Sequence, residues 1–248
     1  MTLNFLMVFK TYIVFYELNM ASVNKSLMLY LYTRFKKSKQ YMFYFAKTPW
    51  LLKKMYPAAI WGMPDREKVI YLTFDDGPHP EITPFVLNEL KKFNAKATFF
   101  CIGNNVVKYR DIYTNIIDDG HKIGNHTYNH LNGWKTDDKK YFTDIAEARK
   151  YIDADLFRPP YGRISKLQLK YLTESFNMKV IMWSVLSGDF DQKITPEACL
   201  KNVVLSTKSG SIIVFHDSEK AFKNMQYALP RTLEYFEKQG YRFDKINL

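Results

Sequence analysis

Short apolar runs alternate with longer helix-like stretches from Lys68 to the end of this 248-residue chain, and this alternation limits the fold most. The runs are rich in β-branched and aromatic residues, so we expect strands at residues 69–74, 97–102, 121–124, 179–183 and 212–215. Helices are expected at residues 82–93, 106–119, 139–152, 165–176, 196–206 and 224–239. Such alternation is typical of parallel strands joined by right-handed helical crossovers, so the sequence predicts one α/β domain.

Two adjacent carboxylates, Asp75 and Asp76, come directly after the first apolar run, and Gly77 and Pro78 then end the strand. The C-terminal ends of parallel strands open onto the crevice in which α/β proteins bind ligands. An Asp-Gly pair in an ordinary turn is the alternative interpretation. Neighbouring carboxylates repel each other, however, unless a cation or a buried arginine offsets their charge. The pair therefore favours a cation site.

Two histidines four positions apart, His126 and His130, form the second pattern. Alone, such a pair is more often two polar residues on one face of an element. Combined with an aspartate, the histidines supply one oxygen and two nitrogen ligands and leave a coordination position open for water, as a hydrolytic zinc site requires. The two cysteines, Cys101 and Cys199, form no Cys-x-x-Cys pair, so a zinc finger is not expected.

Five sequence blocks resemble the polysaccharide deacetylase family, the family 4 carbohydrate esterases with a NodB homology domain. They occur in the family's order at residues 73–78 (TFDDGP), 126–130 (HTYNH), 158–162 (RPPYG), 183–189 (WSVLSGD) and 213–217 (IVFHD). The resemblance extends from about Lys68 to the C-terminus. It implies that residues 65–248 form a catalytic domain with the NodB-like fold, an irregular (β/α) barrel of about seven parallel strands.

The resemblance implies a metal site and a general base. Asp76, His126 and His130 would hold a divalent metal ion, with zinc as the first expectation. Asp75 would be the general base, and Arg158 would hold it in place and keep it ionised. Without the resemblance, an arginine before two prolines is more commonly a surface charge on a rigid loop.

The resemblance also implies a general acid and an oxyanion donor. His216 would be the acid, and Asp189 would orient and charge its ring. The backbone N–H of Tyr161 would share the oxyanion with the metal. On its own, His216 at a strand end is more often a core histidine. Asp217 is expected to cap the following segment rather than take part in chemistry.

The fourth block departs from the family pattern at two positions. Leu186 occupies a position where the family usually has an acid, and Phe190 follows Asp189 where the family commonly has tryptophan. Because Asp189 itself is present, its pairing with His216 is still expected. The two departures concern the shape and polarity of the pocket, and hence the preferred substrate.

Three functions follow as hypotheses. The favoured one is a metal-dependent hydrolase that removes N-acetyl groups from an amino-sugar polymer or oligomer, such as chitin-like material or peptidoglycan. The second is an O-acetyl esterase acting on a polysaccharide such as acetylated xylan. The third is a catalytically silent carbohydrate-binding protein, which is disfavoured because every expected ligand is present. Each hypothesis makes a carbohydrate the partner, and the sequence predicts no oligomeric state.

Residues 1–64 differ in composition from the rest of the chain. They contain nine lysines and arginines against one acid, Glu17, which accounts for +8 of the formal net charge of +11. Basic residues among bulky aromatic ones fit a segment that lies on an anionic membrane surface, and an ordinary leader is the alternative interpretation. No apolar run reaches the 18 or more residues of a spanning helix, and no convincing signal-peptide cleavage site is present.

The same charge pattern argues against nucleic-acid binding, because the excess lies in an aromatic leader and not on a recognition motif. A cell-envelope or membrane-associated location is compatible with this segment, but the sequence alone assigns no compartment.

Overall fold

The computed structural model describes residues 44–65 and 67–248, and Tyr44–Leu248 form one compact unit. The expectations for residues 1–43, which include most of the proposed membrane-interfacial segment, lie outside the described residues. Within the described part, no helix combines the length and the apolar character needed to cross a membrane.

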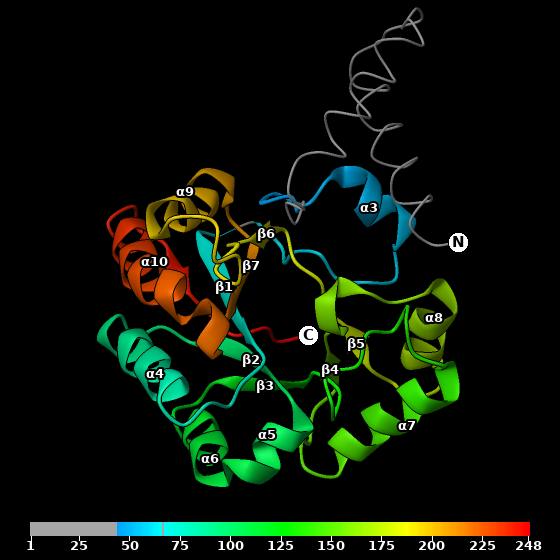
Figure 1. Ribbon diagram of the computed structural model, residues 1–248. Coiled ribbons are helices and arrows are strands. Elements are labelled where there is room, and N and C mark those ends of the chain that lie inside the picture. Colours follow the sequence, from blue (N-terminus) through cyan, green and yellow to red (C-terminus); the bar gives the residue numbers. More distant parts are fainter. Residues whose placement is uncertain (1–43, 66) are drawn as a thin grey trace, which may run out of the picture. The chain divides into compact units, whose positions relative to one another are not determined.

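Seven parallel strands form a curled sheet in the order β5-β4-β3-β2-β1-β7-β6, with helices around it (Figure 1). The strands are β1 (Val69–Asp75), β2 (Ala97–Cys101), β3 (Lys122–Asn125), β4 (Leu156–Phe157), β5 (Lys179–Val180), β6 (Val185–Leu186) and β7 (Ile212–His216). An eighth strand, β8 (Arg242–Phe243), pairs with β1 in parallel beside this path. The predicted irregular barrel of parallel strands is confirmed.

The described helices follow the predicted alternation, with differences at their ends. They are α3 (Trp50–Met55), α4 (Ile82–Lys92), α5 (Gly103–Lys108), α6 (Arg110–Asp118), α7 (Asp138–Arg149), α8 (Lys166–Glu174), α9 (Pro196–Ser206) and α10 (Glu219–Glu237). The helix expected at residues 106–119 is two helices, because Tyr109 between them has non-helical dihedral angles. The start of α9 is as predicted, since the Thr195 hydroxyl accepts a hydrogen bond from the Ala198 N–H at 3.2 Å.

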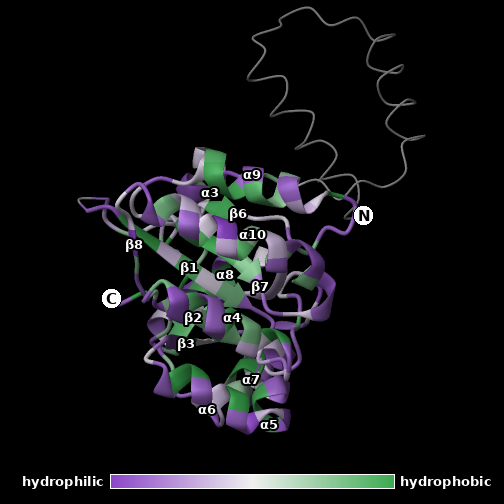
Figure 2. Cartoon of the chain, turned by 90° about the vertical axis from the view of Figure 1, so that its left-hand side faces the viewer, coloured by the Kyte–Doolittle hydropathy of each residue, from purple (hydrophilic) through white to green (hydrophobic). Residues whose placement is uncertain are grey.

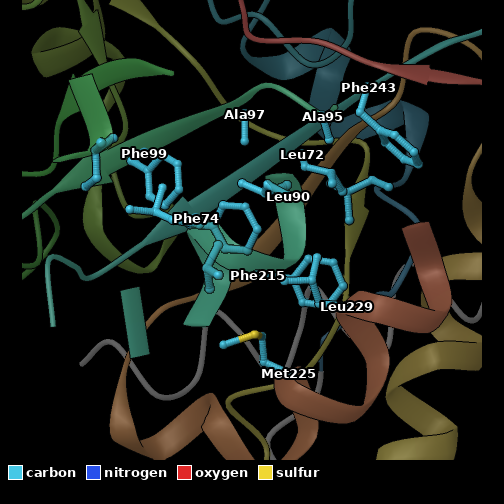
Figure 3. Packing of buried hydrophobic residues seen from close by; sticks show 14 of the residues in the cluster. Leu72, Phe74, Leu90, Ala95, Ala97, Phe99, Phe215, Met225, Leu229 and Phe243 are labelled. Atoms are coloured by element: carbon cyan, nitrogen blue, oxygen red, sulfur yellow. The ribbon is translucent and has the colours of Figure 1, made fainter. Parts of the chain in front are cut away.

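Aromatic side chains of the three central strands form the main core. The ring of Phe74 on β1 stacks on Phe99 of β2 and on Phe215 of β7, with centroids 5.0 and 6.1 Å apart. Met225 and Leu229 of α10 belong to the same cluster and lie beside these rings (Figure 3). Figure 2 shows the apolar strands enclosed by helices that carry hydrophilic residues on their outer sides. This core fixes the ends of β1, β2 and β7 relative to one another.

Residues 44–64, which the sequence assigned to the N-terminal segment, pack against the barrel. Lys47 pairs with Val185 of β6 in an antiparallel bridge, and Ile60 pairs with Ile181 in a parallel one. The Met182 N–H donates to the carbonyl oxygen of Ile60 at 2.7 Å. The compact unit therefore begins at Tyr44, 21 positions before the expected boundary at residue 65.

Candidate active site

Strand register brings the expected site residues to one edge of the sheet. Asp75, the last residue of β1, pairs with His216 at the end of β7. On the other side of β1, His126 directly follows β3 and Arg158 directly follows β4. Since all these strands are parallel, their C-terminal ends meet at the same edge.

Asp76, His126 and His130 come together as the sequence predicts. One ligand atom from each lies within 4.8 Å of the others, and among the described residues no other group of three such side chains does so. The Nε2 atoms of His130 and His126 lie 3.1 and 3.7 Å from the same Asp76 oxygen. Burial would raise the pKa of Asp76, but the hydrogen bond from His130 and the nearby imidazole charges lower it below its usual value. The carboxylate is therefore ionised, as a metal ligand must be.

The orientation of His126 suits a ligand. Its Nδ1 lies 2.7 Å from the carbonyl oxygen of Arg158. Because a carbonyl oxygen only accepts hydrogen bonds, Nδ1 carries the proton, and Nε2 keeps its lone pair toward Asp76. Burial is the main cause that lowers the pKa of His126, to about 4, so the ring is neutral at physiological pH. A neutral imidazole with a fixed tautomer, a second imidazole and a carboxylate fit a divalent metal such as zinc.

The backbone around the triad is unusual. Among the described residues, six non-glycine residues have positive φ angles, and four of these belong to the site: Asp76, Thr127, His130 and Tyr161. A left-handed backbone is unfavourable for such side chains unless the surroundings impose it, and it is common at functional sites. Contacts that hold these loops are therefore part of the site.

Asp144 of α7 holds the loop between the two histidines, and sequence reasoning missed it. Its buried carboxylate accepts hydrogen bonds from the backbone N–H groups of Tyr128 and Asn129, at 2.8 and 3.0 Å. The residue lies on the face of α7 that also buries Tyr141 and Ile145. An acid on an otherwise apolar helix face was the signal available in the sequence.

Asp217 has a different role from the expected one. It does not cap α10, whose N-cap position is Ser218 and has no side-chain cap. Instead, its carboxylate accepts from the Gly77 N–H at 3.0 Å and from the Thr83 hydroxyl at 2.5 Å. Burial raises the pKa of Asp217 to about 8. The prediction of a cap was wrong because the fold brings Gly77, which directly follows Asp76, within hydrogen-bond distance of the Asp217 carboxylate.

Asp75 and Arg158 form a buried ion pair, with 2.7 Å between Oδ1 and Nη1. Arg158 is fully buried, and its other N–H groups donate to the Thr73 hydroxyl and to the carbonyl oxygens of Ile181 and Met182. A buried guanidinium with this many partners has one orientation. It therefore holds the Asp75 carboxylate in place, and Arg158 is not a surface charge.

His216 and Asp189 form a second pair, in which Asp189 is buried and His216 is partly buried. The Nδ1 of His216 lies 2.8 Å from Oδ1 of Asp189, and the His216 backbone N–H donates to Oδ2 at 2.7 Å. Burial by itself would lower the pKa of His216, but the charge and hydrogen bond of Asp189 outweigh it and raise the pKa to about 10. The ring is therefore protonated at neutral pH, with Nδ1–H donated to Asp189 and Nε2–H available to a ligand.

Tyr161 lies beside the metal triad. It forms the middle of a 3₁₀ turn, Pro160–Gly162, and its ring centroid is 4.6 Å from that of His130. Its side chain is 62% exposed, so the ring borders the site from the solvent side. All eight expected site residues thus lie at one edge of the sheet.

Comparison with known proteins places this geometry in a family. The family model described as polysaccharide deacetylase matches residues 62–181. A peptidoglycan-N-acetylglucosamine deacetylase of Bacillus cereus is 36% identical over 193 residues, which are 75% of this chain and 90% of that protein.

Solved structures agree with the match. The crystal structure of a peptidoglycan N-acetylglucosamine deacetylase in complex with a hydroxamate, a 4-naphthalen-1-yl-N-oxidanyl-benzamide, has a TM-score of 0.73 at 33% identity, covering 80% of this chain and 95% of that one. A carbohydrate esterase family 4 pseudoenzyme from Bacillus anthracis has a TM-score of 0.66 at 26% identity, covering 77% of this chain and 68% of that one.

Proposed function

Because the chain belongs to the polysaccharide deacetylase family, we propose that it is a metal-dependent hydrolase that removes N-acetyl groups from N-acetylglucosamine units of peptidoglycan. The similarity to peptidoglycan deacetylases supports this substrate over chitin-like polymers. The observation that carries the proposal is the convergence of an Asp/His/His triad, an Asp–Arg pair and a His–Asp pair at one sheet edge.

Asp76, His126 and His130 would hold the metal ion, and their donor set of one oxygen and two nitrogens favours zinc. A divalent cation bound there supplies Lewis acidity, which lowers the pKa of water toward 7 and polarises a carbonyl oxygen. The carbonyl oxygen of Arg158 orients the His126 ring, and the carboxylate of Asp144 holds the loop between the two histidines.

Asp75 accepts the proton of the water that attacks the acetyl carbonyl carbon. Arg158 restricts the rotation of this carboxylate, because its guanidinium is hydrogen-bonded to one carboxylate oxygen. The backbone N–H of Tyr161 donates to the oxygen that becomes negative in the tetrahedral intermediate. One such donor typically contributes about 3 kcal/mol to transition-state stabilisation.

His216 completes the reaction. An amine anion is a very poor leaving group, so the nitrogen must receive a proton while the carbon–nitrogen bond breaks. The protonated Nε2 of His216 supplies it, and Asp189 stabilises the imidazolium beforehand. The products are acetate and the free amino sugar.

Acetate release from N-acetylated peptidoglycan tests the proposal. The purified chain is treated with a chelator, and zinc is then added back in stoichiometric amount. We expect loss of acetate release on chelation and its recovery with zinc. Activity that persists without metal would reject the mechanism.

The same experiment separates the alternatives. Acetate from acetylated xylan without acetate from N-acetyl sugars would identify an O-acetyl esterase. Tight binding of peptidoglycan fragments by the zinc-loaded chain without any acetate release would identify a silent binding protein.

A further inference from the structure

A segment before the family-matched residues pairs with β6 through an antiparallel bridge between Lys47 and Val185. The Leu186 N–H donates to the carbonyl oxygen of Ala46 at 2.8 Å, and the Thr48 N–H donates to that of Ser184 at 2.9 Å. These bonds lie on both sides of the Lys47–Val185 bridge. Since β6 leads directly into the loop that carries Asp189, the segment is fixed next to the acid half of the site.

Tyr44, at the start of this segment, contacts that loop on both sides of Asp189. Gly188 has a φ angle of +79°, and a Cβ added there would lie 2.5 Å from the Tyr44 hydroxyl oxygen. The rings of Tyr44 and Phe190 have centroids 5.2 Å apart. Burial and the nearby charge of Asp191 raise the pKa of the Tyr44 hydroxyl to about 12. Tyr44 therefore contacts the residue before Asp189 and the residue after it.

The contacts continue to His216. The ring of Phe190 meets the imidazole of His216 edge-on, with centroids 5.2 Å apart. Asp189, between Gly188 and Phe190, holds both Nδ1 and the backbone N–H of the same histidine. Two chains of contacts thus link Tyr44 to His216. One passes through the ring of Phe190, and the other passes through Gly188 and the adjoining Asp189.

The loop has a second anchor of a different kind. The side-chain amide of Asn224 on α10 donates to the carbonyl oxygens of Asp189 and Asp191, both at 3.1 Å. Asn224 fixes the carbonyl groups, whereas Tyr44 fills the space against Gly188 and Phe190. Losing Tyr44 should therefore displace the Asp189–His216 pair without unfolding the loop.

We propose that Tyr44 is a positioning residue for the general acid, acting through Gly188 and Phe190 on the Asp189–His216 pair. The proposal rests on the proposed N-deacetylase function, in which His216 protonates the departing amine. Proton transfer requires hydrogen-bond distance to the leaving nitrogen, and a displacement of about 1 Å can reduce the rate about 10²-fold. Because Asn224 remains, we expect a smaller loss.

The test is Tyr44→Ala in the full chain, assayed on two substrates. One is an N-acetylglucosamine oligomer, whose amine must be protonated as it leaves. The other is 4-nitrophenyl acetate, whose phenolate leaves without a proton. We expect kcat on the amide to fall about tenfold and kcat on the ester to fall less than about twofold. The ratio of the two rates does not depend on how much of the variant is folded.

Two further variants serve as controls. Tyr44→Phe keeps the ring against Gly188 and Phe190 and loses only the hydroxyl, so it should restore most of the amide activity. Trp50→Ala alters a 70% exposed side chain in the same segment and should leave the ratio unchanged. An equal loss on both substrates, or no loss on either, would overturn the positioning role. A wild-type chain that cleaves the ester but never the amide would overturn the N-deacetylase function and, with it, this proposal.

Discussion

The two halves of the site shift the pKa of their histidines in opposite directions. In the metal half, on the β3 side of β1, the Nδ1–H of His126 is donated to a backbone carbonyl, and the pKa is lowered to about 4. In the acid half, on the β7 side, the Nδ1–H of His216 is donated to the Asp189 carboxylate, and the pKa is raised to about 10. The His126 ring is buried and the His216 ring is largely buried, so the hydrogen-bond partner decides which histidine can bind a cation and which can donate a proton.

The last residues of β1 connect the two halves. Asp75 is the last residue of β1, and Asp76 follows it with a positive φ angle, so that the two carboxylates have different partners. Asp76 thereby joins the two histidines, while Asp75 binds Arg158. The repulsion expected between neighbouring carboxylates is offset separately, by imidazoles on one and by a guanidinium on the other.

Removing a ligand from the metal half should have the largest effect. We expect His126→Ala to lose both bound zinc and acetate release, because the two remaining ligands bind a cation too weakly to retain it. Metal content after desalting, measured by atomic emission, checks this. His79→Ala is the matched control, since His79 lies outside the triad, and it should keep its zinc. A zinc-replete His126→Ala variant would contradict the assignment.

The second-largest effect is expected from substitution of the general base, Asp75. Asp75→Asn preserves the hydrogen bond from Arg158 but cannot accept a proton. We expect full metal content together with a fall in kcat of about 10²- to 10⁴-fold. Near-normal turnover in the zinc-loaded variant would remove Asp75 as the base.

The acid half should discriminate between leaving groups. His216→Ala is expected to reduce hydrolysis of the N-acetyl substrate about 10²-fold or more, and that of 4-nitrophenyl acetate much less. Steady-state rates on both substrates measure the difference. Equal losses would mean that His216 does not act by protonating the leaving group.

The smallest effect is a shift in pH dependence. Asp189 raises the pKa of His216, so the protonated ring is present below that pKa and is lost as pH rises through about 10. Asp189→Asn removes the charge, and the alkaline limb of kcat should therefore move to lower pH. The stability that this pair contributes has the same sign: it is complete below the unfolded pKa of about 6.5 and is lost as pH rises through about 10. An unchanged alkaline limb in Asp189→Asn would separate the pair from catalysis.

The sequence by itself determined the long strands, the fold class and a set of candidate site residues that the fold brings to one edge of the sheet. β1 and β7 are long apolar runs, and acids or histidines at their ends have few places to point other than the crevice. Strands β4, β6 and β8 escaped prediction because two residues are too few to show a period, whereas β5, also of two residues, begins a longer apolar run at residues 179–183. The five family-like blocks indicated candidate site residues that hydrophobic periodicity could not, because the blocks follow strand ends even where the strand is short.

Tertiary structure alone decided how the site residues are held. Asp217 binds Gly77, 140 positions away in the sequence. Asp144, a residue of α7, binds the loop between the two histidines. Tyr44, which precedes the expected domain, contacts the loop that carries Asp189. The contacts of Asp217 and Tyr44 leave no local pattern, and the acid on the apolar face of α7 does not reveal its partner, because each contact depends on how separate strands and helices pack. The protonation state of each histidine was decided in the same way, since it depends on burial and on a partner distant in sequence.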